Sequence, residues 1–439
     1  MLRECYGDYI LAEYAISKIA SARANRNDRK SDGGSIGGPE RVAITSRTVY
    51  LVDQLKHPDE VELLRTVYGN AFYMIGVVSS EQRRSARLRS EEGVKATNIS
   101  TLIEVDRKES NDHGQQLEKT LHRSDFFVST DSPQREAIKI QLDRFFKLVH
   151  GDSSITPTRD EFGMYTAYSS GLRSACLSRQ VGAALLDNQG NVLATGRNDV
   201  PAPGGGLYTP EHKAADARCT NWGAGSCRNQ DEKEKIKKEF ERIASEVLSE
   251  KIKMIKTCNV AVEDLSFIAK DLAGSMYKNT RVRDLIEFSR SIHAEMDVIT
   301  SIARKGSASS VGGSLYSTTF PCHNCARHIV AAGIKKVVYI EPYEKSLALA
   351  LHDDAITLDV GQFNEESNVE KVLFVHFEGV SPRLYRELFE AISDRKDRDG
   401  RPIRLKIAIA GQKIPAYLDP YTDFESKVAD HWANQAKKI

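Results

Sequence analysis

The chain has 439 residues, with 62 lysines and arginines against 61 aspartates and glutamates, so its formal net charge is +1. A chain of this length forms two or three domains with a buried core, and its balanced charge gives no long-range attraction to a polyanion. The 40% hydrophobic content fits a soluble protein. The sequence also has no run of about 18 apolar residues, the length that a membrane-spanning helix needs.

The N-terminus does not resemble a secretory signal, since its first ten residues include Arg3, Glu4 and Asp8 instead of an apolar core. The chain contains 7 cysteines, an odd number, and two of them belong to a motif described below. We therefore expect a cytoplasmic protein in a reducing compartment, without a disulfide framework.

The first 150 residues alternate apolar and helical stretches. Residues 21–40 are polar and glycine-rich and predict a loop, and residues 56–69 predict a short helix. Three apolar stretches predict buried strands, at 41–55, 70–80 and 124–129. This alternation predicts a parallel α/β domain over residues 1–150.

A second α/β domain is expected over residues 151–380, after a linker at 151–164. Two apolar strands around Asp187–Gly190 predict a hairpin, and a long loop at 199–230 follows. The remaining elements are predicted as a capped helix at 159–176, a charged helix at 231–256, a helix at His293, a strand at 313–320, a helix at Cys322 and a strand at 335–343. Residues 381–439 are polar and are expected to form a C-terminal extension.

His293 and Glu295, followed by Cys322 and Cys325, form a candidate metal site. One imidazole and two thiolates leave the fourth position of a tetrahedral zinc open, as in catalytic zinc sites. Cys322 and Cys325 are three apart, so they share one face at a helix start. Glu295 is too close to His293 to be a second ligand, and we assign it proton transfer. The alternatives are a closed structural zinc site and two buried cysteines without metal. The neighbouring His323 and His328 are interpreted as polar helix residues.

The combination H-x-E and P-C-x-x-C is the signature of zinc-dependent nucleobase deaminases. Residues 173–341 resemble the deoxycytidylate deaminase group of the cytidine deaminase superfamily, through SRQVGAALL, ATGRNDVP, IHAEMDVI and TTFPCHNCARHIVAAGIKKVVYIEPY. VYLVDQLKHPDEVELLRTVYG, FYMIGVVSS, SDFFVS and TPTRDEFGMYTAYSSGLRSACLSRQVGA extend the resemblance to bacterial antiphage dCTP-type deaminases. The resemblance implies an α/β fold, with a P-loop kinase-like N-terminal domain and a cytidine-deaminase-like α/β/α sandwich.

By this resemblance, His293, Cys322 and Cys325 bind Zn²⁺ and Glu295 carries protons. Asn198, at the end of the hairpin, matches the asparagine that contacts the base and sugar of the substrate. The alternative for Asn198 is a capping or turn residue. The backbone N–H of Ala294 is expected to orient an edge of the pyrimidine.

The sequence departs from the family in two places. It has no G-x-x-x-x-G-K-[ST] phosphate loop, and the glycine-rich residues 33–38 lack the lysine of such a loop. Cys219 and Cys227 lie near His212 in an insert where some deoxycytidylate deaminases hold a second, structural zinc. Unpaired thiols are the favoured alternative.

The phosphates of a nucleotide require cations. Candidates around the predicted pocket are Arg173, Arg179, Arg197, Lys213 and Lys345. Each of them alone is more often a solvated surface charge. Tyr343 and Lys345 directly follow a strand end, which places them near the mouth of a cleft, so we expect this pair, with Arg179, to bind substrate.

These features predict a zinc-dependent enzyme that deaminates free deoxycytidine nucleotides, dCTP and also dCMP, in antiphage defence by dCTP depletion. The alternatives are a housekeeping dCMP deaminase supplying dUMP and an RNA or single-stranded DNA cytosine deaminase. The latter would favour a basic channel with stacking aromatics, whereas this chain has a net charge of +1 and 2 tryptophans. We expect a homo-oligomer without nucleic acid as substrate; a regulatory RNA or nucleotide is a further candidate partner.

Overall fold

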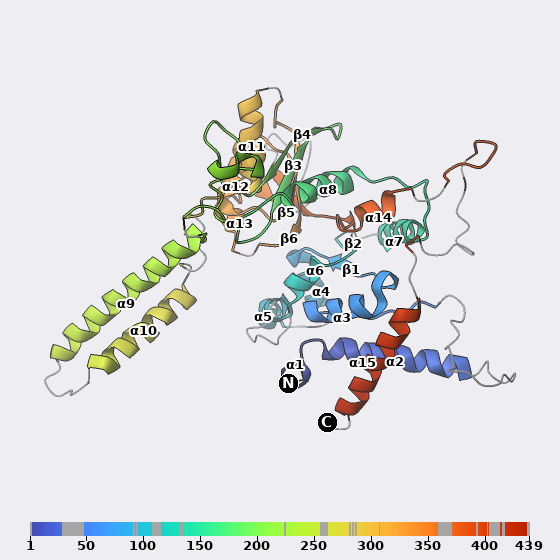
Figure 1. Ribbon diagram of the computed structural model, residues 1–439, viewed down its shortest axis with the longest axis horizontal. Helices are drawn as coiled ribbons and strands as arrows, with labels where there is room; N and C mark the ends of the chain where they lie inside the picture. Colours follow the sequence, from blue (N-terminus) through green and yellow to red (C-terminus); the bar gives the residue numbers. More distant parts are fainter. Residues whose placement is uncertain are drawn as a thin grey trace. The chain divides into compact units, whose positions relative to one another are not determined.

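A computed structural model of the chain describes residues 2–28, 48–90, 93, 95–107, 116–131, 135–223, 225–254, 262–280, 282, 285, 288–306, 308–343, 345–358, 371–391, 394–401, 403, 413–414 and 418–436. Its contacts divide the chain into two compact units, residues 1–162 with 376–439, and residues 163–375. The expected division at 150 and 380 differs from these limits, because residues 376–439 group with the N-terminal part. Figure 1 shows the elements along the chain.

The first unit is mainly helical. Its helices are α1 (Leu2–Tyr6), α2 (Ile10–Asp28), α3 (Pro58–Tyr68), the 3₁₀ turn η1 (Gly69–Ala71), α4 (Glu81–Ser90), α5 (Ala96–Arg107), α6 (Leu117–Leu121), α7 (Arg135–Val149), α14 (Tyr385–Phe389) and α15 (Leu418–Ala436). Its strands are β1 (Ile75–Val78), β2 (Phe126–Ser129) and β9 (Gly379–Val380). β1 and β2 run parallel, as expected, whereas β9 pairs antiparallel with β2.

Two apolar clusters hold this unit together. Phe126 and Val128 of β2 pack against Phe145 and Leu148 of α7 and Val380 of β9. A second cluster joins α2, α3 and α15 through Ala12, Ile16, Leu64, Val67 and Val428. Helix α3 begins as its sequence predicts, with His57 as the N-cap, Pro58 in the first turn and Glu60 completing a capping box.

The strand expected at 41–55 is wrong in its described part. Residues 48–55 form no strand, and Val49 and Leu51 are 87% and 91% exposed. An apolar run predicts burial but does not identify its partner. Here the second neighbour of β2, beside β1, is β9 from the C-terminal part of the chain. Residues 41–47, and the glycine-rich residues 33–38, lie outside the described residues.

The second unit is built on a six-stranded sheet. Its strands are β3 (Gly182–Leu186), β4 (Val192–Arg197), β5 (Ser314–Thr319), β6 (Lys336–Glu341), β7 (Ile356–Thr357) and β8 (Val372–His376), in the order β4-β3-β5-β6-β8-β7. β3 pairs antiparallel with β4 and β5, and β5 pairs parallel with β6. The hairpin and the parallel strands confirm the predicted order.

Helices pack on both faces of this sheet, which confirms the α/β/α sandwich. Its helices are α8 (Arg159–Gly171, which begins in the first unit), η2 (Pro210–Ala215), α9 (Arg228–Met254), α10 (Val262–Asn279), α11 (Ala294–Lys305), α12 (His323–Ala331) and α13 (Ala348–Leu351). Ala183 and Leu185 of β3 share a core with α11 and α12. The other face meets α8, where the backbone oxygen of Ala167 approaches Gly182 so closely that a Cβ there would lie 1.9 Å from it.

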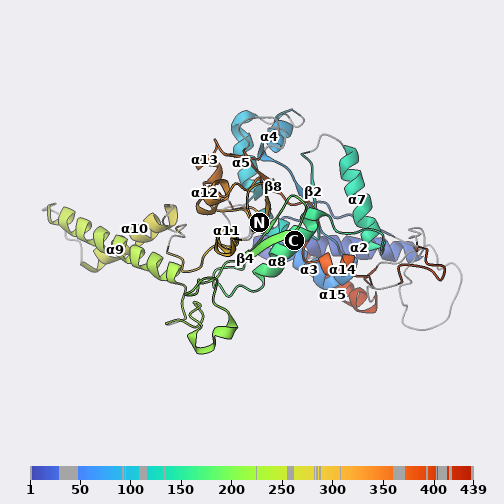
Figure 2. The same ribbon diagram turned by 90° about the horizontal axis from the view of Figure 1, so that it is seen from above.

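Helices α9 and α10 lie side by side as an antiparallel pair (Figures 1 and 2). Helix α9 confirms the predicted helix at 231–256 over residues 231–254; residues 255 and 256 lie outside the described residues. Helix α10 had not been predicted. Among the described residues, no helix combines the length and the apolar character that crossing a bilayer requires.

Candidate active site

His293 is positioned by the start of helix α11, for which it is the N-cap residue. The helix packs against β4 at Gly196, where a Cβ would lie 2.4 Å from the backbone oxygen of Ala294. Only glycine permits this approach, so the sequence of β4 fixes how closely the beginning of α11 meets the sheet. Ala294 is fully buried and begins α11, so its N–H has no partner within the helix.

Helix α12 supplies the two thiols. Cys322 is its N-cap, and the sulfur accepts a hydrogen bond from the backbone N–H of Cys325 at 3.5 Å. Both cysteines are buried, at 4% and 1% exposure. The predicted helix start therefore places both sulfurs on one face, at the end of the helix that favours negative charge.

The three candidate ligands converge. The Nδ1 atom of His293 lies 3.3 Å from the sulfur of Cys322 and 3.3 Å from the sulfur of Cys325, and all three ligand atoms lie within 4.8 Å of one another. A side-chain hydrogen bond from the Cys325 thiol, followed by one from His293, lowers the pKa of the Cys322 thiol to about 4. Two buried thiols and one imidazole at this spacing fit a zinc ion with three protein ligands.

Glu295 lies beside this group on the first turn of α11 and is 4% exposed. Burial raises the pKa of its carboxyl above the usual value, although the nearby His293 opposes the shift. The hydroxyl of Ser317, on β5, donates a hydrogen bond to Oε1 of Glu295 at 3.2 Å. A carboxyl whose pKa is raised in this way takes up a proton more readily than an exposed one, which suits a group that both accepts and donates protons.

Ser317 was not predicted. It is fully buried on the core side of β5, the side that Leu315 shares. The signal was present in the sequence: along SLYSTT, the positions on the same face as Leu315 are Ser317 and Thr319. A core face that becomes polar towards the end of a strand indicates a site at that end.

Asn198 binds the backbone of the segment before β3. Its Nδ2 donates to the backbone oxygen of Arg179 at 2.8 Å, and its Oδ1 accepts from the N–H of Val181 at 2.7 Å. The side chain is 7% exposed. These two hydrogen bonds fix residues 179–181, and the contact with substrate stays a prediction.

Arg179 lies at the carboxyl ends of β5 and β6. Its guanidinium forms an ion pair with Glu341 and contacts the hydroxyl of Thr319 at 3.4 Å. Tyr343 and Lys345 follow β6 at the same end of the sheet; Tyr343 packs against the core, and Lys345 is exposed. The structure therefore brings Arg179, Tyr343 and Lys345 to the sheet end from which Cys322 follows β5.

The other cations that had been considered for phosphate differ in their surroundings. Arg197 is buried, with Nε 3.6 Å from an oxygen of Asp199 and a terminal nitrogen donating to the backbone oxygen of Tyr208 at 3.0 Å. Burial lowers its pKa, and the neighbouring Arg173 adds to the shift. Arg173 and Lys213 are exposed. Arg197 thus serves the packing around β4.

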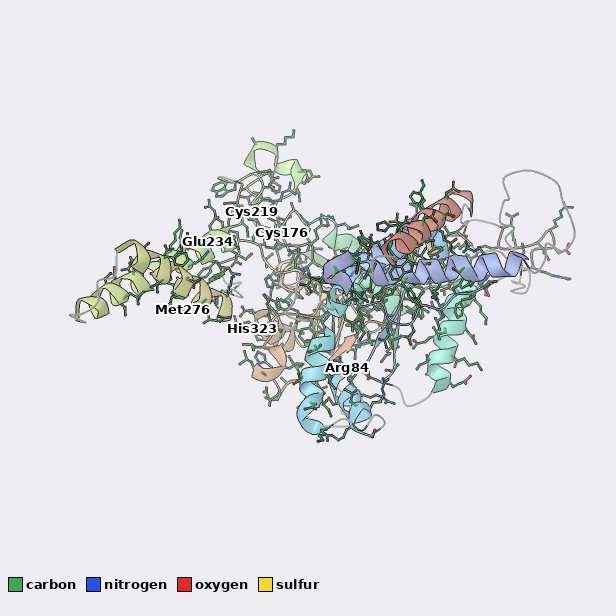
Figure 3. The ribbon with its side chains drawn as sticks, turned by 90° about the horizontal axis from the view of Figure 1, so that it is seen from below. Arg84, Cys176, Cys219, Glu234, Met276 and His323 are labelled. Carbon is green, nitrogen blue, oxygen red and sulfur yellow. The ribbon has the colours of Figure 1, made fainter. Side chains whose placement is uncertain are left out.

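Cys219, Cys227 and His212 do not form a metal-binding group within the described part of the chain. The two groups found there are His293 with Cys322 and Cys325, and Asp8 with His57 and Asp59. His212 caps η2 by accepting from the N–H of Thr209 at 3.0 Å. Burial raises the pKa of the Cys219 thiol, and the thiols of Cys176 and Cys227 contribute to this shift; Figure 3 labels Cys219 and Cys176.

His57 has a structural role in the second group. Its Nδ1 accepts from the backbone N–H of Asp59 at 3.3 Å, and its Nε2 contacts the side-chain amide of Gln116 at 3.1 Å. Both ring nitrogens are therefore engaged within the protein, and His57 is the N-cap of α3.

Comparison with known proteins agrees with the site. The family model for the cytidine and deoxycytidylate deaminase zinc-binding region matches residues 157–341. Deoxycytidylate deaminase of Enterobacteria phage T2 is 30% identical over 182 residues, which cover 41% of this chain and 78% of the phage protein. That of Enterobacteria phage T4 is 29% identical over 180 residues, covering 41% and 76%.

A solved structure of dCMP deaminase from the cyanophage S-TIM5, in complex with dCMP and dUMP, matches 46% of this chain and 93% of its own, with 22% identity and a TM-score of 0.26. The phage T2 match covers most of that enzyme, and the family model spans the histidine and cysteine motifs described above. The chain therefore belongs to the cytidine and deoxycytidylate deaminase family and carries its zinc-binding region.

Proposed function

We propose that the protein hydrolyses deoxycytidine nucleotides to deoxyuridine nucleotides and ammonia. The observation that carries this proposal is the buried Glu295 beside the converging His293, Cys322 and Cys325. The names of the phage T2 and T4 relatives, both deoxycytidylate deaminases, support a nucleotide as the substrate.

In this proposal His293, Cys322 and Cys325 hold zinc, which when bound supplies the Lewis acidity that activates water towards an amidine carbon. Glu295 takes a proton from the attacking water and gives it to the ring nitrogen as the hydroxyl adds to the amidine carbon. It then carries the proton of that hydroxyl to the amine, which leaves as ammonia when the carbon–nitrogen bond breaks and the carbonyl forms. Ser317 keeps the carboxylate in position through its hydrogen bond to Oε1. Burial excludes bulk water from this transfer.

The remaining residues orient the nucleotide. The N–H of Ala294, which has no partner within α11, meets an edge of the pyrimidine. Asn198 holds residues 179–181 and so shapes the pocket on the side of the base and sugar. We assign the phosphate end to Arg179, Tyr343 and Lys345, where a phosphate would compete with Glu341 for the guanidinium.

Within this class we favour dCTP, with dCMP as the second candidate, and a role in antiphage defence by depletion of dCTP. The resemblance of the N-terminal half to dCTP-type deaminases supports the triphosphate, whereas the phage relatives are named for the monophosphate. A balanced charge also favours a small nucleotide over a polynucleotide, because a triphosphate needs only a few well-placed cations.

The test is incubation of the purified protein with dCMP, dCDP, dCTP, CTP and a cytosine oligonucleotide, with uracil products separated by chromatography. We expect uracil from the free deoxynucleotides and none from the oligonucleotide. Lys345→Met should reduce turnover of dCTP far more than that of deoxycytidine, which has no phosphate to bind. Equal losses on both substrates would remove Lys345 from the phosphate site.

A further inference from the structure

Helices α9 and α10 pack through small residues. Ala244 of α9 and Ala269 and Ala273 of α10 are 6%, 0% and 1% exposed, which places them on the line where the two helices meet. Small side chains allow the two backbones to approach closely. The two helices can therefore bury these alanines while the side chains beside the contact line stay exposed.

Large apolar residues stay exposed beside this contact line. Ile243 stands one position before the buried Ala244, and Ile268 and Leu272 stand one position before the buried Ala269 and Ala273. Val247 and Met276 lie four positions after Ile243 and Leu272, one helical turn further along the same faces. Two antiparallel helices with the same offset from their contact line present such residues on the same side of the pair. The exposed residues are Ile243 (48%), Val247 (48%), Ile268 (47%), Leu272 (44%) and Met276 (42%); Figure 3 labels Met276. We call these five residues the apolar face.

Among the exposed positions that the structure describes, the opposite side of the pair is polar apart from one residue. It carries Lys238, Glu241, Ser245, Lys270 and Lys278 at helical spacing from the contact line. The exception is Phe267, which is 73% exposed. The two sides thus differ in character, as expected where one side meets a partner.

The edges of the apolar face are acidic. On α9, Glu239 and Glu246 lie four positions before and three after Ile243, and Glu250 lies three after Val247, all on the side away from α10. On α10, Asp271 lies three positions after Ile268. The exposed pair of Arg242 and Glu246, at 2.7 Å, offsets one of these charges. Glu239, Glu250 and Asp271 add further negative charges on the described part of the edge.

This edge disfavours a second copy of the chain on the apolar face. A two-fold pairing centred on α9 would set its row of glutamates against the same row of the copy. Pairing α9 with α10 of the copy would set glutamates against Asp271. Like charges placed opposite one another oppose association, whereas a basic edge on a partner would be attracted.

We propose that the apolar face binds a basic amphipathic helix of another protein, whose apolar residues meet Ile243, Val247 and Leu272 and whose lysines or arginines meet the acidic edges. Helices that dock with apolar anchors at spacings of three and four residues are a recurring mode of recognition. This inference does not depend on the proposed deamination.

The test uses the full-length protein and a fluorescent peptide of about 18 residues, five helical turns, with leucines on one face and lysines elsewhere. Binding is measured by fluorescence anisotropy. A peptide with glutamates in place of lysines tests the charge, and a scrambled leucine–lysine peptide of the same composition tests the helical face. We expect binding of the first peptide only.

Variants locate the site. The double variant Val247→Ser, Leu272→Ser should weaken binding at least about tenfold, as should Glu239→Lys with Glu246→Lys. Phe267→Ser, on the opposite side, is the matched control and should change affinity less than about twofold. Circular dichroism checks that each variant is folded.

The proposal is overturned if the lysine peptide does not bind, if the glutamate or scrambled peptide binds equally well, or if Phe267→Ser weakens binding as much as the double variant. It is also overturned if sedimentation shows self-association that the Val247→Ser, Leu272→Ser variant abolishes, because a second copy would then occupy the face.

Discussion

At the residue scale, the site depends on groups whose surroundings set their chemistry. Glu295 is buried, so its carboxyl takes up a proton more readily than an exposed one, and Ser317 holds it by a single hydrogen bond. His293, Cys322 and Cys325 lie within reach of one ion. Four of these five residues could be predicted from motif spacing. The contact of Ser317 with Glu295 could not, because no local motif specifies which side chain the polar end of β5 meets.

The three ligands predict one zinc ion per chain. Elemental analysis of the purified protein should find about one equivalent of zinc, as expected for a site with three protein ligands. Cys325→Ala should lose most of it, because two ligands bind zinc far more weakly than three. Cys219→Ala is the control and should keep the metal. Full zinc content in Cys325→Ala would show that another set of residues binds the ion.

Ser317→Ala should lower kcat about tenfold while zinc content is unchanged, since one hydrogen bond to a charged group contributes about 1.5 kcal/mol. Steady-state kinetics with elemental analysis measures both. Ser314→Ala, at the other end of β5, should have little effect. If the two variants behaved alike, Ser317 would have no positioning role.

At the element scale, the close approach of α11 to β4 determines where His293 and Glu295 lie. The hairpin of β3 and β4 could be predicted from its two apolar stretches and the turn between them. The approach at Gly196 could not, because a glycine in a strand does not identify which backbone comes near it.

Gly196→Ala should therefore displace the start of α11. The added Cβ would lie 2.4 Å from the backbone oxygen of Ala294 and 2.8 Å from the backbone nitrogen of Val298. We expect a loss of about 1–3 kcal/mol in the free energy of unfolding, as for other overpacked sites, together with lower kcat. Denaturant unfolding and kinetics measure these.

Gly274→Ala in α10 is the matched control. No atom lies within 4 Å of a Cβ at this position, so alanine should be neutral or stabilise the helix by about 0.5–1 kcal/mol. If Gly196→Ala and Gly274→Ala destabilised the protein equally, the close approach of α11 to β4 would not be the cause of the effect at Gly196.

At the scale of the whole molecule, the two units differ in how well the sequence predicts them. The sandwich of the second unit follows from strand and helix patterns that lie close together in the chain. In the first unit, α15 packs on α2, joined by an ion pair between Arg23 and Glu425, about 400 residues apart. Because the two helices lie near opposite ends of the chain, the local pattern of neither one identifies the other as its partner.

The packing of α15 makes a direct prediction for the first unit. Val428 contacts the cluster of Ala12, Ile16, Leu64 and Val67, so Val428→Asp should destabilise the unit by roughly 1–3 kcal/mol. Thermal unfolding measures the change. Lys427→Gln, at an exposed position of the same helix, should leave the unfolding temperature nearly unchanged. Similar effects of both would mean that α15 adds no apolar packing.

The measurement that tests the central proposal most directly compares the wild-type protein with Glu295→Gln at equal zinc content, on dCTP and dCMP, with deoxyuridine nucleotides quantified by chromatography. The glutamine keeps the size of the side chain but cannot carry the proton. We predict that the wild-type protein forms the uracil nucleotides and that the variant does so at least about 100-fold more slowly. A near-normal rate in Glu295→Gln, or uracil formed from an oligonucleotide but from neither nucleotide, would contradict the account.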